Sequence, residues 1–500
     1  MEDWTRIRLT PEEPQPTTRL PQAVLLLVIL LLLTVYRMWV IPRLGVTLYI
    51  DEAQYWTWAQ DLDWGYFSKP PLIAWLIWLS TSLLGNGLLA VKLPALLLYP
   101  ATAWMLFLLA QKLFDVRIGF RAGVAFALIP IVSALGLAVS TDAPLLFCWT
   151  AAMLFLLRAI ESDRMSDWLW LGAAVGLGIM AKYTMAAFGA SAMLYLLLDR
   201  RRRHIFAHPG LWAAIALACV IVLPNIVWNW SHDFPTLRHT ADITHVEGFN
   251  DKHGNLGEFL AAQAGSLGPG FALAFLAGLA LAQRKWRDAR YQFLLCFSLP
   301  LLALVFLQAL RSEANGNWAA PALVTALLLG VVQLSRIRSR WWIAALGLNI
   351  VVMLAAYHLG DYFVLTGQVQ PARLDPLKRA KGWDRLAAQV RPILGAHPGA
   401  ILLTKDRTMM AHLLYQLRDL NPDHLAWAPH PHPADHYQLT TPLTEEPSSR
   451  PLILVTQSDY ADIASHFTHQ EVLALISVDV EPGLQRQARV VLLEGFKGYH

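Results

Sequence analysis

Charged side chains are scarce in this sequence: Asp, Glu, Lys and Arg make up 15% of its 500 residues, and 56% are hydrophobic. This balance argues against a soluble globule and predicts a polytopic membrane protein. Cysteine is also rare. Cys148, Cys219 and Cys296 each fall inside an apolar segment, so a disulfide framework and a cysteine metal site are not indicated. No Walker A sequence is present, which argues against an ATP-driven pump. Nothing indicates a nucleic-acid partner.

Long apolar runs take the place of the missing charge. Residues 1–19 are polar and predict a disordered cytoplasmic tail, and Leu20 to Val40 predicts an uncleaved first span. By the ~20-residue criterion, further candidate spans lie at 93–113, 119–138, 142–160, 168–181, 184–198, 210–229, 258–282, 291–310, 318–335 and 341–359.

The apolar segment 71–85 is short for a span, and the distribution of basic residues decides how it is interpreted. If it lies at the outer interface without crossing, every Arg- and Lys-rich loop falls on the same side as the N-terminus. The positive-inside rule therefore favours about eleven spans, with the N-terminus in the cytoplasm and the C-terminus outside.

The composition changes near residue 370. Short apolar runs at 400–404, 452–456 and 490–493 predict strands, and 377–394 and 407–418 predict helices, the second capped by Asp406. We expect an extracytoplasmic α/β domain over 361–500, after a transmembrane domain over 20–360. The first outer loop, residues 41–92, is the part of the transmembrane domain that we expect to carry the site.

That loop contains two adjacent acids, Asp51 and Glu52, within the aromatic stretch 49–58, followed by a Gly-Tyr-Phe-Ser-Lys-Pro-Pro element at 65–71. Ionisable groups beside a membrane are costly and suggest function. Since Tyr and Trp favour the headgroup level, we expect the stretch to lie along the membrane surface with its acids facing a cleft. The alternative is a solvated loop whose acids face water.

The predicted topology places further polar residues at the outer ends of spans. They are Lys69, Asp142, Lys182, Arg238, His239, Arg311, Glu313 and Asn317. Each has a simpler interpretation as well: Asp142 could cap a helix, Lys182 could snorkel to the headgroups, and Arg311 could contact them. Their convergence on one face is the evidence for a site.

These elements resemble the GT-C membrane glycosyltransferases. The resemblance rests on the Asp-Glu pair after the first span, the Tyr-Phe-x-Lys-Pro-Pro element, an Asp-x-Pro that opens a later span, and Arg-x-Glu-x-Asn-x-Asn-Trp from Arg311 to Trp318. It covers about 49–360. The most similar branch contains the protein O-mannosyltransferases, the aminoarabinose transferase of lipid A and the lipid A galacturonosyltransferases.

The resemblance implies transfer of a sugar from a polyprenyl phosphate to an acceptor, with Asp51 as the catalytic acid and Lys69 on the lipid phosphate. By the same resemblance Lys182 would be a further phosphate-side cation, and the charge that develops on the phosphate would also suit Arg311. Asp142 would support a metal or the acid, and Glu52 is the rival of Asp51. Candidate contacts to acceptor or sugar are Tyr55, Tyr66, Arg238, His239, Glu313 and Asn317. A divalent metal ion is possible, but Ser68 replaces the Glu that helps to hold it in the aminoarabinose branch.

The expected protein is thus an inverting glycosyltransferase of the bacterial inner membrane, with its active site and C-terminal domain in the periplasm. Its partners would be a polyprenyl-phosphate-linked sugar, membrane lipids, and an acceptor that is lipid A or its core, another glycolipid or a protein. A lipid or sugar transporter is the main alternative, but transporters hold substrate near the midplane between repeats. A non-catalytic scaffold would leave the first outer loop unexplained.

Overall fold

The computed structural model describes residues 19–244, 254–444 and 450–499 and divides into two compact units. The first, called here the helical unit, comprises residues up to 39, 69–76 and 92–355. The second, the sheet unit, comprises 40–68, 77–91 and the chain from 356 onward. The sheet unit therefore joins most of the first outer loop to the C-terminal residues, an association that the sequence did not predict.

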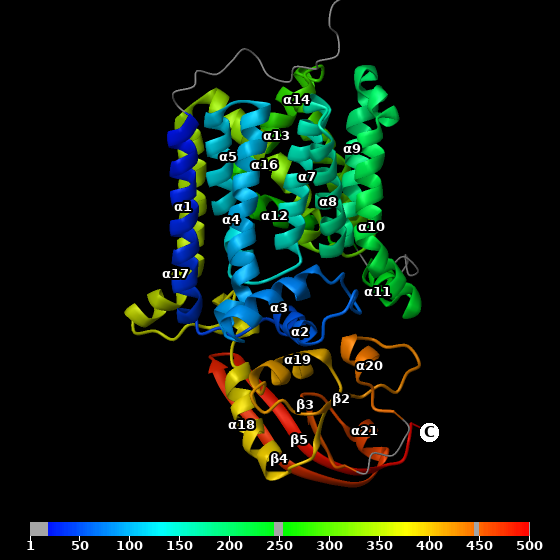
Figure 1. Cartoon of the computed structure of the whole chain (residues 1–500). Helices are drawn as coiled ribbons and strands as arrows, with labels where there is room; N and C mark the ends of the chain where they lie inside the picture. Colours follow the sequence, from blue (N-terminus) through cyan, green and yellow to red (C-terminus); the bar gives the residue numbers. More distant parts are fainter. Residues whose placement is uncertain (1–18, 245–253, 445–449, 500) are drawn as a thin grey trace, which may run out of the picture. The chain divides into compact units, whose positions relative to one another are not determined.

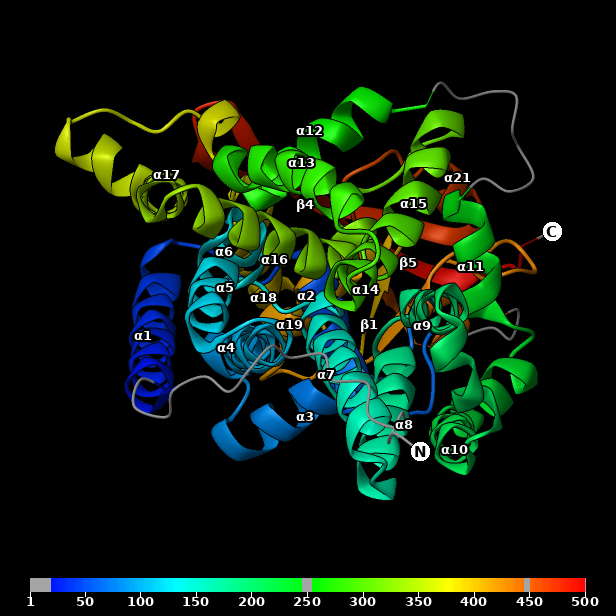
Figure 2. The ribbon, with the colours of Figure 1, turned by 90° about the horizontal axis from the view of Figure 1, so that it is seen from above.

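The helical unit is built from long apolar helices. Its elements include α1 (Arg19–Val40), α4 (Leu88–Leu113), α5 (Val116–Leu128), α6 (Pro130–Leu135), α7 (Asp142–Ser162), α8 (Met165–Ala181), α9 (Ala187–Leu198), α10 (Pro209–Ser231), α11 (Pro235–Thr244), α12 (Leu256–Leu267), α13 (Pro269–Arg284), α14 (Ala289–Cys296), α15 (Leu299–Arg311), α16 (Ala320–Ile337) and α17 (Ser339–Leu365). Helices α7, α8 and α10 pack side by side along a common direction, as Figures 1 and 2 show.

Every segment expected to span is helical, but not every helix is long enough to cross alone. Within the described residues, seven helices meet the length and hydropathy requirement, and the bent pair α12–α13 raises this to eight. The pair bends by 103° at Gly268, whose φ is +81°, immediately before Pro269. The expected span 119–138 breaks before Pro130, because a residue preceding proline is driven to an extended conformation. The count of about eleven crossings stays a prediction.

The ambiguous segment 71–85 forms α3 (Leu72–Leu84), a helix of 13 residues. At 1.5 Å per residue such a helix covers roughly two thirds of a hydrocarbon core. Its length therefore agrees with a segment that does not cross, although its place in the membrane stays a prediction.

The C-terminal part of the sheet unit contains a five-stranded mixed sheet in the order β2-β1-β3-β5-β4. Its strands are β1 (Ile401–Thr404), β2 (His424–Ala426), β3 (Leu452–Thr456), β4 (Phe467–Glu481) and β5 (Leu484–Phe496). Strand β1 runs parallel to both β2 and β3, and β5 runs antiparallel to β3 and β4. The strands expected at 400–404, 452–456 and 490–493 are confirmed.

Four helices accompany the sheet: α18 (Trp383–Ala396), α19 (Arg407–Gln416), α20 (His436–Thr440) and α21 (Ala461–Ser465). Asp406 caps α19 as predicted, since its Oδ1 accepts the N–H of Met409 at 3.0 Å. The helix expected at 377–394 begins later, at Trp383, after the left-handed Gly382 with φ +83°. The prediction of a helical membrane protein with a C-terminal α/β domain is confirmed.

The predicted topology can be tested by cysteine labelling in a background that carries Cys219→Ser, because Cys219 is the exposed native cysteine and Cys148 and Cys296 are buried. Arg117 and Arg287 are exposed and lie in loops expected in the cytoplasm. We expect a membrane-impermeant maleimide to label Arg117→Cys and Arg287→Cys only after lysis, and to label Asp61→Cys, in the first outer loop, in intact cells. Labelling of all three in intact cells would contradict this orientation.

Candidate functional site

Helix α2 (Ile50–Gln60) separates the two adjacent acids into different roles. Glu52 is buried, with 1% of its surface exposed, and its Oε2 accepts the backbone N–H of Tyr49 at 2.8 Å. It therefore stabilises the start of its own helix, where a negative charge is also favoured by the helix dipole. Neighbouring helical residues point about 100° apart. Asp51 accordingly faces elsewhere, with 57% of its side chain exposed.

The Asp51 carboxylate is bound by an arginine from the C-terminal part of the sheet unit. Arg407, the first residue of α19, donates from Nη2 to Oδ1 of Asp51 at 2.5 Å. Asp51 and Arg407 are 356 residues apart, so sequence reasoning had no signal that would pair them.

Most aromatic residues between 55 and 67 are buried in protein, which corrects the expectation that they face the headgroups, whereas Trp64 is 51% exposed. Trp58 and Tyr66 stack in parallel with centroids 4.5 Å apart, and Tyr55 lies 5.0 Å from Trp58. The Tyr66 hydroxyl donates to the Trp58 carbonyl at 2.9 Å. Tyr55 and Tyr66 are only 5% and 2% exposed. Both therefore shape the loop, and their predicted contact with sugar gains no support.

His436 of α20 completes this aromatic cluster and was missed by the sequence analysis. Its ring meets Trp58 and Tyr66 edge-on, with centroids 5.5 and 5.7 Å away. Burial lowers the pKa of His436 to about 3, so the ring is neutral in the folded protein at neutral pH. A lone histidine in a C-terminal segment offers no signal that would connect it with residues 58–66.

A second polar cluster lies in the helical unit, around Asp142. Its Oδ1 accepts from Lys182 Nζ at 2.8 Å, and its Oδ2 accepts from Asn317 Nδ2 at 2.7 Å. Asp142 begins α7, Lys182 follows the last residue of α8, and Asn317 lies in the 3-10 turn Gly316–Ala319. The structure thus brings together three candidates that the sequence assigned to three separate outer turns.

The simpler interpretations of Asp142 and Lys182 do not hold. The side chain of Asp142 is 2% exposed and its carboxylate binds two side chains of other elements, so it does not serve as a helix cap. Lys182 is 13% exposed and paired, so it does not snorkel to the surface. A buried ion pair that also has a neutral hydrogen-bond donor satisfies its charges internally.

Next to Lys182, Tyr183 is tied to α10 by hydrogen bonds that the sequence analysis did not anticipate. Its hydroxyl donates to Oδ1 of Asn225 at 2.6 Å and accepts from Nδ2 of Asn229 at 3.1 Å. Asn225 and Asn229 are one turn apart on α10. Two asparagines four residues apart in an apolar span were the available signal, since buried amides need partners.

The remaining candidates lie in other places of the helical unit. Arg238 and His239 are on α11, and the exposed Arg311 ends α15. Lys69 is half-buried, directly before Pro70 and Pro71. Glu313 lines a cavity together with Asp242, Asn255, Glu258, Asn315 and Trp318.

The residues around Asp142 do not fit a metal ion. Within the part of the chain that the structure describes, no group of three or more His, Cys, Asp or Glu side chains is close enough to hold one. Both oxygens of Asp142 already accept hydrogen bonds from nitrogen donors, one of them a cation. Lys and Asn nitrogens in these positions compete with a divalent ion and do not recruit one.

Comparisons with known proteins place this chain among membrane glycosyltransferases. Residues 68–228 match the family described as dolichyl-phosphate-mannose-protein mannosyltransferase. The lipid A galacturonosyltransferase RgtD of Rhizobium johnstonii is 32% identical over 433 residues, which cover 86% of this chain and 90% of that protein. An undecaprenyl phosphate-alpha-4-amino-4-deoxy-L-arabinose arabinosyl transferase of Pseudomonas savastanoi is 29% identical over 32% of this chain and 31% of its own length.

The fold agrees with these matches. The crystal structure of ArnT from Cupriavidus metallidurans bound to undecaprenyl phosphate superimposes with a TM-score of 0.65, covering 94% of this chain and 97% of that one at 16% identity. The chain belongs to the family of GT-C membrane glycosyltransferases that contains lipid A galacturonosyltransferase RgtD. It is therefore a multi-pass membrane enzyme of the class that uses polyprenyl-phosphate sugars, as the sequence predicted, and the transporter interpretation is set aside.

The Asp142–Lys182 pair leads to a prediction about folding. Asp142→Asn leaves the Lys182 ammonium buried without its carboxylate, which should destabilise the protein by roughly 3–5 kcal/mol. Adding Lys182→Met removes that stranded charge, so the double variant should recover much of the lost thermal stability in detergent. A double variant that is less stable than Asp142→Asn alone would contradict the prediction that the unpaired Lys182 charge causes the loss of stability.

His436 leads to a prediction about pH. The unfolded chain binds a proton near the ordinary histidine pKa of 6.5, whereas the folded chain does so only near 3, so acidification favours unfolding. The loss begins below about 6.5 and amounts to ~2 kcal/mol near pH 5. We expect thermal stability to fall less between pH 7 and 5 in His436→Phe than in the native protein. His469→Phe, on the exposed face of β4, is the control, and an unchanged pH response in His436→Phe would contradict the prediction.

Proposed function

We propose that this enzyme transfers galacturonic acid from a polyprenyl phosphate carrier to lipid A. The observation that carries the proposal is the 32% identity to lipid A galacturonosyltransferase RgtD along nearly the whole of both chains. The partial match to aminoarabinose transferases covers about a third of the chain and makes aminoarabinose the competing sugar. By the same likeness, we place the protein in the bacterial inner membrane with its first outer loop and C-terminal domain in the periplasm.

We assign the general base to Asp51. The acceptor hydroxyl must lose its proton as its oxygen bonds to the anomeric carbon, and an accessible carboxylate can accept that proton. Asp51 is accessible, whereas the Glu52 carboxylate is buried and holds the start of α2. This contrast supports Asp51 over its neighbour.

We assign the stabilisation of the leaving group, the lipid phosphate, to cationic side chains of the helical unit. As the bond between the anomeric carbon and the phosphate oxygen breaks, the electron pair stays with the lipid phosphate, whose negative charge grows. Fixed cations stabilise that charge. Lys69 is our first candidate and Arg311 the second. Lys182 is held by Asp142, so we assign this pair mainly to fixing the helix ends of the helical unit. Contact with the phosphate would be a lesser role of Lys182.

The proposal is tested with purified enzyme, a synthetic polyprenyl-phosphate galacturonic acid and lipid A. We expect mass spectrometry of the product to show lipid A heavier by one galacturonosyl residue. NMR of the new linkage should show the anomeric configuration inverted relative to the donor, as a single displacement requires. Transfer only from the corresponding aminoarabinose donor would reassign the sugar. Transfer from neither donor would contradict the proposed function.

The same assay separates the two acids. Asp51→Asn keeps the shape of the side chain and removes its basicity, so activity should fall by roughly 10²–10⁴ while membrane yield is retained. Glu52→Gln can still accept from the Tyr49 N–H through its carbonyl oxygen, so its loss of activity should be much smaller. Full activity in Asp51→Asn together with a large loss in Glu52→Gln would transfer the role to Glu52.

A further inference from the structure

The Arg407–Asp51 ion pair is the feature of the sheet unit that the proposed reaction does not explain. The two side chains are 32% and 57% exposed. Exposed ion pairs typically contribute about 0–1 kcal/mol to folding. Such a pair adds little to the free energy of unfolding, so stabilisation of the fold does not account for it.

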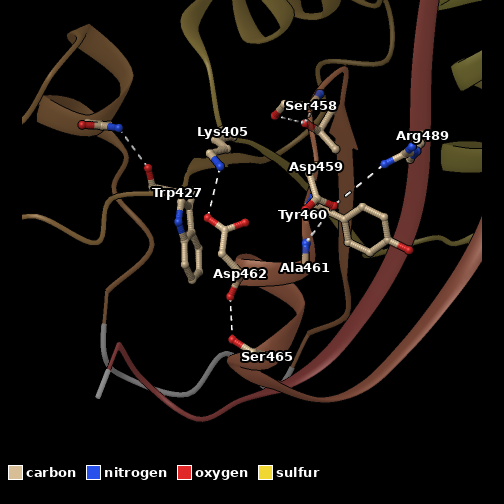
Figure 3. Close-up of polar contacts among 11 residues, drawn as sticks. Lys405, Trp427, Ser458, Asp459, Tyr460, Ala461, Asp462, Ser465 and Arg489 are labelled. Carbon is tan, nitrogen blue, oxygen red and sulfur yellow. Dashed lines mark hydrogen bonds and ion pairs between the residues drawn. The ribbon is translucent and has the colours of Figure 1, made fainter.

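The start of α19, which carries Arg407, is oriented by its cap and by contacts of the residues before it. Lys405 forms an ion pair with Asp462 of α21 at 3.1 Å, as Figure 3 shows. Asp406 caps α19, and its carbonyl accepts the Thr404 hydroxyl at 3.3 Å. The backbone that carries Arg407 is therefore oriented by the residues immediately before it.

The place of this loop in the sheet is also informative. Strand β1 lies between its parallel neighbours β2 and β3. The chain adds β2 on one side of β1 and then β3 on the other side, so the strand order reverses at β1. The carboxyl ends of such strands, where the order reverses, are where open α/β sheets usually place ligand-binding residues. Arg407 lies three residues after the last residue of β1, at this end of the strand, and its guanidinium binds the carboxylate of Asp51.

Helix α2 is held against the same part of the sheet unit. The Trp56 ring meets Tyr415 of α19 edge-on at 5.2 Å, and its indole N–H donates to Asn86 at 2.7 Å. The hydroxyls of Thr57 and Tyr437 are 3.2 Å apart. Both partners of the Arg407–Asp51 pair thus stand on backbones that are fixed to each other.

We propose that Arg407 is a positioning residue for sugar transfer: by binding Oδ1 of Asp51 it fixes the rotamer of that carboxylate and leaves Oδ2 turned to the acceptor hydroxyl. This inference rests on the proposed role of Asp51. It gives the C-terminal domain a direct part in the reaction, although no catalytic motif is recognised in the sequence of this domain. A planar guanidinium on a fixed helix can impose such an orientation better than an ammonium can.

The test uses the full-length enzyme with Arg407→Gln, Arg407→Lys and the control Arg391→Gln. Arg391 pairs with Asp419 at 2.6 Å in the same unit, and its side chain is 40% exposed. We expect Arg407→Gln to lower kcat by roughly 10- to 100-fold, the usual cost of a misplaced catalytic group, with KM for the donor unchanged. Arg407→Lys should recover part of the loss, and Arg391→Gln should retain native kinetics.

A double-variant comparison shows whether Arg407 acts through Asp51. In an Asp51→Asn background, Arg407→Gln should cause no further fall, because the carboxylate that it orients is already gone. An equal fall in both backgrounds, a native rate in Arg407→Gln, or a rise in donor KM would overturn the proposed positioning role. Failure of the proposed function is recognised separately, because the native enzyme would then transfer no sugar. Failure of the base role proposed for Asp51 would be seen as full activity of Asp51→Asn.

Discussion

The cost of burying a charge among apolar helices is the constraint that organises the helical unit. An isolated charge there would be expensive, so it needs an opposite charge or other polar groups, such as the Ala127 carbonyl that accepts from the buried Arg37. Asp142 meets this need for Lys182 and also takes the amide of Asn317. One carboxylate therefore ties the start of α7, the end of α8 and the turn before α16 together. The position of these helix ends depends on that pair.

Helix α2 of the sheet unit combines a buried aromatic side with an exposed carboxylate. The stack of Trp58 on Tyr66, with His436 at its edge, excludes water from one side of α2. Asp51 on the same helix stays accessible. This exposure suits the general-base role that we propose for Asp51, because a base must be reached by the acceptor hydroxyl. The burial of Glu52 suits a residue that holds the helix start.

The sequence predicts those features whose cause is local. Asp406 before a helix, the apolar runs of β1 and β3, and the apolar helices follow from residues close together in the chain. It predicts less where partners are distant: Arg407 with Asp51, and His436 with Trp58, are separated by more than 350 residues. The burial of Tyr55 and Tyr66 was missed for the same reason. Aromatic residues beside a span suit a membrane interface equally well until their packing partners are known.

The C-terminal residues contain no catalytic motif, yet they supply much of the packing of the motif helix. Glu52 stabilises the first turn of α2 from within the loop, but Trp56, Thr57 and Trp58 find partners at Tyr415, Tyr437 and His436. A helix of 11 residues is marginal alone in water, so its order must come from such tertiary contacts. The first outer loop thus carries motif residues on which the resemblance rests, whereas much of the structure that orders α2 is encoded at the other end of the chain. Motif residues alone would therefore not preserve the geometry of Asp51.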